Sequence, residues 1–189
     1  NYNIVNFPMG NTGVQMGGWF RSEIKSVNDL KGLKMRTAGF AGEVLSRMGV
    51  VPQQLAGGDV YPALEKGTLD AVEFVGPFDD EKLGFNKVAQ YYYYPGWWEG
   101  GPQISMYINE KSWNALPQSY QMVVEMATRH APTPTLARYD ARNPPALRRL
   151  TATGAHPPPF PRDVTATSCE AAHPVYKDFR ARHPKLTAP

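Results

Sequence analysis

Ala71-Val72-Glu73-Phe74-Val75-Gly76-Pro77 is an apolar run that carries one carboxylate, Glu73, near its centre. Sequence of helical character lies on both sides, so the run is predicted to be an inner strand of an α/β sheet. Burying an ionised carboxylate without a partner is costly. Glu73 is therefore expected to be protonated, paired with a cation, or placed at the end of the strand, where a ligand would arrive.

A second run of strand character, Leu33-Lys34-Met35-Arg36, ends in a charged residue and is followed by a glycine-containing helix start. In open α/β sheets the carboxyl ends of the strands open onto the ligand crevice. Arg36 and Glu73 are therefore predicted to face one cleft.

Strands and helices alternate around these runs, with glycines as terminators and Asp59 as a candidate N-cap. The predicted elements are a short helix at 27–31, strands at 33–37, 50–55 and 71–75, helices at 41–48, 59–66 and 79–83, and strands at 91–94 and 103–108. The order strand, helix, strand, helix, strand implies parallel pairing with right-handed crossovers. The predicted fold class is α/β, with parallel-rich sheets flanked by helices.

Prolines divide the C-terminal third of the chain. Pro132 and Pro134 are expected to break or kink a helix, and Pro144-Pro145 to end the next one. The expected elements are a helix at 117–130, a resumed helix at 136–142, an extended link at 154–161 and a terminal helix at 163–182 interrupted at Pro174.

The composition excludes several classes of protein. With 20 Lys and Arg against 17 Asp and Glu, the net charge of +3 is too weak to indicate nucleic-acid binding. No apolar run is long enough to span a membrane. The first residues lack the pattern of a secretory signal, which a mature secreted chain would also lack. Cys169 is the only cysteine, so no internal disulfide can form and the compartment stays open.

Searches for catalytic motifs find no nucleophile for a hydrolase. The glycines of the segment 10–18 match neither the dinucleotide fingerprint nor the phosphate loop, and are interpreted as turn glycines. The histidines lack metal-ligand spacing, and no Gly-x-Ser-x-Gly elbow is present.

Several longer segments together resemble one family. They are Gly10-Asn11-Thr12-Gly13-Val14-Gln15-Met16-Gly17-Gly18-Trp19-Phe20, Leu33-Lys34-Met35-Arg36, Gly49-Val50-Val51-Pro52-Gln53-Gln54, the segment 56–67 (AGGDVYPALEKG), the segment 76–85 (GPFDDEKLGF) and the segment 91–102 (YYYYPGWWEGGP). In this order they strongly resemble the periplasmic solute-binding proteins of tripartite ATP-independent periplasmic (TRAP) transporters, in particular the branch that binds 2-oxoacids such as pyruvate. The resemblance is dense from about residue 11 to 126 and thinner beyond, where the segment 139–144 still fits.

The resemblance implies a fold, a partner and a location. It implies two α/β domains around a cleft that closes on a small carboxylate, a long C-terminal helix that can mediate a homodimer, and a periplasmic receptor that delivers its ligand to membrane permease subunits. Family members have a substantial portion before the Gly-Asn-Thr-Gly segment, so this chain looks like a C-terminal part. Residues 1–108 are then the α/β ligand-binding portion and residues 109–189 the C-terminal helical region that completes the fold.

The resemblance also implies a site. Arg36 matches the arginine that grips the ligand carboxylate. Glu73 and Phe74 match the positions that bind a cation beside the ligand, through the carboxylate and the next backbone carbonyl; the branch often has Trp where this chain has Phe74. Gln15 resembles the third contributor, an amide oxygen that reaches cation and ligand. Oxygen ligands suit Na⁺ or Ca²⁺, and a lone carboxylate favours Na⁺.

Each of these residues also has a structural interpretation. Arg36 could form a surface salt bridge and Gln15 could be a turn amide bonded to nearby backbone. The aromatic residues Trp97, Trp98 and Tyr91–Tyr94 are expected to form core or an interface rather than a cleft wall. Asp79-Asp80-Glu81 is expected to be a helix start or a solvated face.

The sequence thus favours a receptor that captures a 2-oxoacid without converting it. One alternative changes the ligand to a 2-hydroxyacid such as lactate, bound with Ca²⁺. The other is a metal-assisted enzyme acting on 2-oxoacids, such as an aldolase or a decarboxylase. No histidine or lysine stands in a recognisable acid–base motif, which argues against the enzyme.

Overall fold

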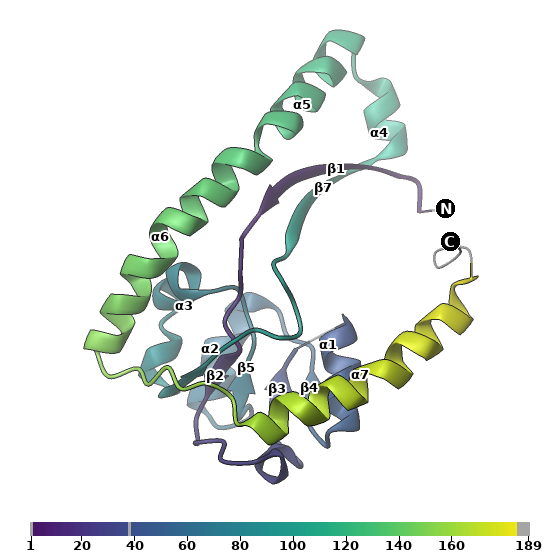
Figure 1. Ribbon diagram of the computed structural model, residues 1–189. Coiled ribbons are helices and arrows are strands. Elements are labelled where there is room, and N and C mark those ends of the chain that lie inside the picture. The colour runs from purple at the N-terminus through teal and green to yellow at the C-terminus, as the bar shows by residue number, and fades with distance from the viewer. Residues whose placement is uncertain (1, 38, 185–189) are drawn as a thin grey trace.

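The computed structural model describes residues 2–37 and 39–184, which form a five-stranded sheet, a separate two-stranded ladder and helices around both (Figure 1). The strands are β1 Ile4–Asn11, β2 Gly18–Phe20, β3 Lys34–Arg36, β4 Val51–Gln53, β5 Ala71–Val72, β6 Tyr91–Tyr93 and β7 Gln103–Asn109. The helices are α1 Gly39–Arg47, α2 Gly57–Glu65, α3 Pro77–Leu83, α4 Glu110–Ala115, α5 Gln118–His130, α6 Pro132–Ala152 and α7 Arg162–Arg182, with 3-10 turns η1 Val27–Leu30 and η2 Phe85–Lys87.

The five-stranded sheet has the order β4-β3-β5-β2-β6. Strand β3 pairs in parallel with both β4 and β5, which confirms the parallel arrangement predicted for the strands at 33–37, 50–55 and 71–75. Strand β5 is an inner strand, as predicted, and lies at the centre of this sheet. It is shorter than predicted, because regular pairing stops at Val72. Glu73 therefore lies just beyond the carboxyl end of a buried strand.

The sequence prediction missed β1 and β2, and it interpreted all the glycines of the segment 10–18 as turn glycines. Gly10 lies within β1 and Gly18 opens β2, which pairs antiparallel with β5 and β6. Gly18 has a φ of +102°, and a Cβ atom there would lie 2.5 Å from the carbonyl oxygen of Val72. Only glycine allows the chain to approach β5 so closely at this point.

Aromatic residues from β2 and β6 form much of the core. Trp19 stacks on Tyr92 with 3.9 Å between ring centroids, and both side chains are fully buried. The hydroxyl of Tyr93 accepts the N–H of Ile24 and donates to its carbonyl oxygen. Within the tyrosine run, Tyr92 and Tyr93 are core residues as predicted, whereas Tyr94 is exposed.

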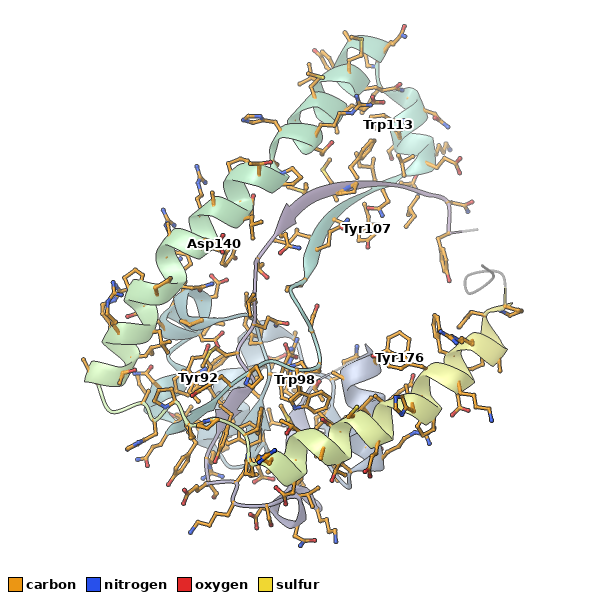
Figure 2. The ribbon with its side chains drawn as sticks, in the orientation of Figure 1. Tyr92, Trp98, Tyr107, Trp113, Asp140 and Tyr176 are labelled. Carbon is orange, nitrogen blue, oxygen red and sulfur yellow. The ribbon has the colours of Figure 1, made fainter. Side chains whose placement is uncertain are left out.

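The two-stranded ladder of β1 and β7 stands apart from the main sheet, with α4, α5 and α6 beside it (Figure 1). The strands run antiparallel, with Ile4 opposite Asn109 and Asn11 opposite Gln103. Trp113 of α4, labelled in Figure 2, packs its ring 5.0 Å from that of Phe7. Helix α4 was not predicted, since its six residues are too few for a periodic pattern.

The prolines interrupt the helices less than the sequence suggests. Helix α5 ends at His130 and α6 begins at Pro132, so a break is present where Pro132 and Pro134 predict one. The predicted end at Pro144-Pro145 is wrong, because α6 continues to Ala152, and α7 likewise continues through Pro174. Contacts with other elements hold these helices, including the paired hydrogen bonds from Arg149 of α6 to Glu81 of α3.

The chain from α6 to α7 is extended, as predicted, and runs beside β6. The N–H of Tyr92 donates to the carbonyl oxygen of His156 at 2.7 Å, and Tyr94 and Pro159 form a further parallel bridge. Helix α7 then packs on α1, where Arg47 and Asp178 lie 2.6 Å apart. Among the described residues no helix is long and apolar enough to cross a membrane. The division of the chain between residues 108 and 109 stays a prediction.

Candidate functional site

Arg36 and Glu73 meet at the carboxyl ends of β3 and β5. The N–H of Glu73 donates to the carbonyl oxygen of Arg36 at 3.0 Å, which continues the pairing of the two strands by one bond. The Nη1 of Arg36 donates to the backbone carbonyl of Glu73 at 2.8 Å and to its Oε2 at 3.4 Å. The parallel strands therefore bring together two charges that lie far apart in the sequence.

Gln15 comes from the connection between β1 and β2 and lies against the same carboxylate. Its Nε2 donates to Glu73 Oε1 at 2.9 Å and to the carbonyl oxygen of Phe74. Gln15 is 3% exposed, and its Oε1 is buried without a hydrogen-bond partner among the described residues. The interpretation of Gln15 as a turn amide bonded to nearby backbone is wrong, because its partners lie 58 and 59 residues away.

The surroundings of the Gln15 amide could hold a small cation between three oxygen atoms. Two oxygen atoms, Glu73 Oε1 and the Phe74 carbonyl, point at this donor nitrogen. A half-turn of the amide exchanges Oε1 for Nε2, and Gln15 Oε1 would then join the other two oxygens. Three converging oxygens without a cation would repel one another, whereas Na⁺ or Ca²⁺ takes such ligands. The orphaned Gln15 Oε1 thus fits a cation site.

The acidic side chains limit which cation this would be. Among residues 2–37 and 39–184, no three or more His, Cys, Asp or Glu side chains gather closely enough to hold a metal ion. A cation at Gln15, Glu73 and Phe74 would therefore be held by one carboxylate and two neutral oxygens. This set suits a hard ion of low charge.

Burial raises the pKa of the Glu73 carboxyl to about 7. The Arg36 guanidinium and the hydrogen bond from Gln15 favour the ionised form, but they offset only part of the desolvation. Near neutral pH, Glu73 is thus divided between its protonated and ionised forms. Additional positive charge beside it would favour the ionised form.

Phe74 contributes a ring as well as a carbonyl. Its ring packs edge-on against Phe85 at 5.7 Å, and the guanidinium of Arg36 lies 5.2 Å from the centre of the Phe74 ring. Arg36 Nε also donates to the carbonyl oxygen of Leu55 at 3.4 Å. Among the described residues these bonds use Nε and Nη1 only, so Nη2 keeps its donors for another acceptor.

A second buried carboxylate, Asp80 of α3, lies behind the same loop. Its Oδ2 accepts hydrogen bonds from Tyr92 Oη at 2.7 Å and Trp19 Nε1 at 3.0 Å. Burial raises the pKa of Asp80 to about 6. The sequence places Asp80 in the first turn of a helix, which is correct, but the interpretation of this acidic run as a solvated face is wrong for Asp80, which is 2% exposed.

Two further acidic residues and the neighbouring tryptophans lie away from this cluster. Asp70 accepts the N–H of Lys34 at 2.9 Å, and Asp59 lies in the first turn of α2 rather than at its N-cap, which is Ala56. Trp97 and Trp98 line a cavity of about 300 Å³ between α1 and α7, and none of Gln15, Arg36, Glu73 or Phe74 lines it. Figure 2 shows Trp98 near α7, with Tyr176 farther along that helix.

The geometry can be compared with known proteins. The chain matches the bacterial extracellular solute-binding proteins of family 7 (DctP) over residues 1–182. It belongs to this family. The predicted resemblance to TRAP solute-binding proteins and the predicted fold class are confirmed. Family 7 proteins bind solutes for transport and are not enzymes, which removes the metal-assisted enzyme as an alternative.

Several proteins that this chain resembles are named with the ligand that they bind. The chain is 51% identical over 178 residues to a monocarboxylate 2-oxoacid-binding periplasmic protein of Nostoc, covering 94% of this chain and 49% of the relative. A TRAP solute-binding protein of Bordetella bronchiseptica, solved as a mixed-occupancy dimer with calcium and picolinate, is 54% identical with a TM-score of 0.94, over 100% of this chain and 56% of that one. One from Pseudoalteromonas atlantica, solved with sodium and pyruvate, is 40% identical with a TM-score of 0.90, over 96% and 55% of the two chains. The chain thus spans about half the length of these relatives.

Proposed function

We propose that this chain is part of a periplasmic receptor that captures a small 2-oxoacid of the pyruvate type and delivers it to the membrane permease of a TRAP transporter. The observation that carries the proposal is the cluster of Arg36, Gln15, Glu73 and Phe74 at the carboxyl ends of β3 and β5. The named ligands of the Nostoc and Pseudoalteromonas relatives, a 2-oxoacid class and pyruvate, support the choice of ligand.

Arg36 binds the ligand carboxylate in this proposal. Its Nη1 and Nε are already held by the carbonyl oxygens of Glu73 and Leu55, and the ring of Phe74 lies beside the guanidinium. These contacts fix the plane of the guanidinium before a ligand arrives. Nη2, which the described residues leave free, can donate charge-assisted hydrogen bonds to the ligand carboxylate from a fixed position, which the mobile ammonium group of a lysine cannot reproduce.

Glu73, the Phe74 carbonyl and Gln15 hold a cation that also contacts the carboxylate and 2-oxo oxygens of the ligand. The ligand's negative charge then lies between Arg36 and the cation, and Glu73 is neutralised on its buried side. Na⁺ is the favoured ion because the set holds a single carboxylate, and Ca²⁺ is the alternative. Sodium and calcium in the Pseudoalteromonas and Bordetella structures support both choices.

Calorimetry tests this function. The protein is a longer receptor chain that contains these 189 residues and has the full length of the relatives, of which this chain spans about half. Pyruvate, lactate and picolinate are each titrated after removal of metal ions, and again with added Na⁺ or Ca²⁺. We expect pyruvate to bind only when a cation is present, and more tightly than lactate, in keeping with the named ligands of the Nostoc and Pseudoalteromonas relatives. Failure of pyruvate to bind under every ionic condition would refute the proposal.

A further inference from the structure

Asp80 connects the candidate cation site to the core. Its Oδ2 receives Trp19 Nε1 from β2 and Tyr92 Oη from β6, two side chains that stack on each other. Its Oδ1 faces the loop between β5 and α3, where the N–H groups of Gly76 and Val75 lie at 3.3 and 3.5 Å. One carboxylate therefore joins the neighbouring strands β2 and β6 to the loop that carries Glu73 and Phe74.

The geometry of a peptide unit gives this contact a consequence for the site. The N–H of Val75 and the carbonyl of Phe74 belong to the same trans peptide, so the two groups point in opposite directions. When the N–H of Val75 faces Asp80, the carbonyl oxygen of Phe74 faces away from Asp80. On that side lies Gln15, whose Nε2 contacts this oxygen.

We propose that Asp80 is a positioning residue for the cation site, which orients the Phe74 carbonyl by holding the N–H groups of Val75 and Gly76. This inference rests on the proposed function, because the carbonyl matters as a ligand only if a cation binds there. It adds a residue that touches neither the ligand nor the cation.

The charge of Asp80 adds to its geometric effect. A carboxylate that accepts the N–H of a peptide polarises that peptide and makes its carbonyl oxygen a better ligand. Asp80 is buried at 2% exposure, so water does not screen this effect. Loss of such an outer contact typically lowers metal affinity by about 10- to 100-fold.

Asp80 also supports the core, and the experiment must separate the two roles. Asp80→Asn keeps the shape but leaves one oxygen for four donors, and it removes the charge. Asp80→Ala removes both acceptors. Tyr92→Phe is the matched control, since it removes one hydrogen bond to Oδ2 and leaves the contacts of Oδ1 with Val75 and Gly76 in place.

The measurement is pyruvate affinity across a series of Na⁺ concentrations in the same longer receptor chain, at about pH 8, where both raised carboxyl pKa values are exceeded. We expect Asp80→Asn to raise the half-saturating Na⁺ concentration by about 10- to 100-fold, with pyruvate affinity recovering at saturating Na⁺. Asp80→Ala should raise it at least as far. Tyr92→Phe should lower the melting temperature while the half-saturating Na⁺ concentration stays the same.

Two outcomes would overturn the inference. An unchanged half-saturating Na⁺ concentration in Asp80→Asn would show that Asp80 only supports the core, and this variant decides the matter even if Asp80→Ala does not fold. An equal shift in Tyr92→Phe would show a general effect of lost stability. Absence of any cation dependence in the unmutated receptor would instead refute the proposed function itself.

Discussion

Replacing Arg36 is the most direct perturbation of the proposed site. In Arg36→Ala the ligand carboxylate loses its guanidinium partner, and the carbonyl oxygen of Glu73 loses the 2.8 Å hydrogen bond from Nη1. Losing one partner of a desolvated charge pair typically costs about 3–5 kcal/mol. At about 1.4 kcal/mol per tenfold change, affinity for a 2-oxoacid should fall by about 100-fold to a few thousandfold.

The cost to folding should be much smaller than the cost to binding. Removal of Arg36 leaves the carboxylate of Glu73 without its cationic neighbour, but the pKa of Glu73 is already about 7, so the group can take up a proton instead of remaining charged. Arg36→Lys should recover little affinity, because the three N–H bonds of an ammonium group diverge from one atom and cannot bond the Glu73 and Leu55 carbonyls and the ligand carboxylate in the directions that the planar guanidinium does.

The assay is calorimetric titration of pyruvate into the longer receptor chain, with melting temperatures measured alongside. Arg47→Ala is the matched control: it removes the same charge from an exposed pair with Asp178, a type of contact that contributes about 0–1 kcal/mol. Pyruvate affinity should be unchanged in this control. If Arg36→Ala binds pyruvate within a few-fold of the unmutated chain, the clamp is elsewhere and the salt bridge to Glu73 is the whole role of Arg36.

Three further predictions concern the cation, the length of the chain and its assembly. Glu73→Gln should weaken 2-oxoacid binding by weakening cation binding, and exhaustive removal of metal ions from the unmutated chain should have the same effect. If neither change alters the affinity for 2-oxoacids, Glu73 has a structural role only. A protein of only these 189 residues should bind 2-oxoacids weakly or not at all, because the longer chain contributes the rest of the ligand cleft. Equal affinity of the two proteins by calorimetry would show that the rest of the longer chain is not part of the cleft. The exposed apolar residues Met122, Val123, Met126 and Leu136 of α5 and α6 should pack against a second copy in a two-fold dimer, and light scattering that finds only monomer at high concentration would count against it.

The part of the fold that could be predicted from sequence is the part in which local pattern and burial agree. Strands β3, β4 and β5 are short segments between helices with glycine terminators, so their order and parallel pairing follow from the sequence. Strand β1 has only one buried residue, Gly10, and its partner β7 lies about a hundred residues away. Its pairing is a tertiary contact that no local pattern reports.

The same distinction applies to the site. Glu73 is conspicuous in the sequence because it is a charge within an apolar run, and Arg36 because it ends a run of strand character. Asp80 gives no such signal, since an acidic residue in the first turn of a helix is commonly exposed. Its burial comes from Trp19 and Tyr92, which approach it from two distant strands. A buried carboxylate of this kind becomes visible only when the packing is known.

The raised pKa of Glu73 leads to a last prediction. Arg36 lies closest to the backbone carbonyl of Glu73, at 2.8 Å, and farther from its carboxylate, at 3.4 Å, so the carboxylate is only partly neutralised. A purely structural ion pair would lower the pKa of this carboxyl, whereas here it rises to about 7.

A cation binds the ionised form of Glu73 and must displace the proton where one is present. Cation affinity should therefore increase as the pH rises through about 7 and become constant above it, because the folded chain holds the proton below that value. At about pH 7, binding should release about half a proton per cation, and at about pH 9 almost none. Calorimetry in buffers with different heats of ionisation measures this release. Cation binding that releases no proton at pH 7 and weakens in Glu73→Gln would mean that Glu73 is already ionised, and that Arg36 and Gln15 neutralise it without help.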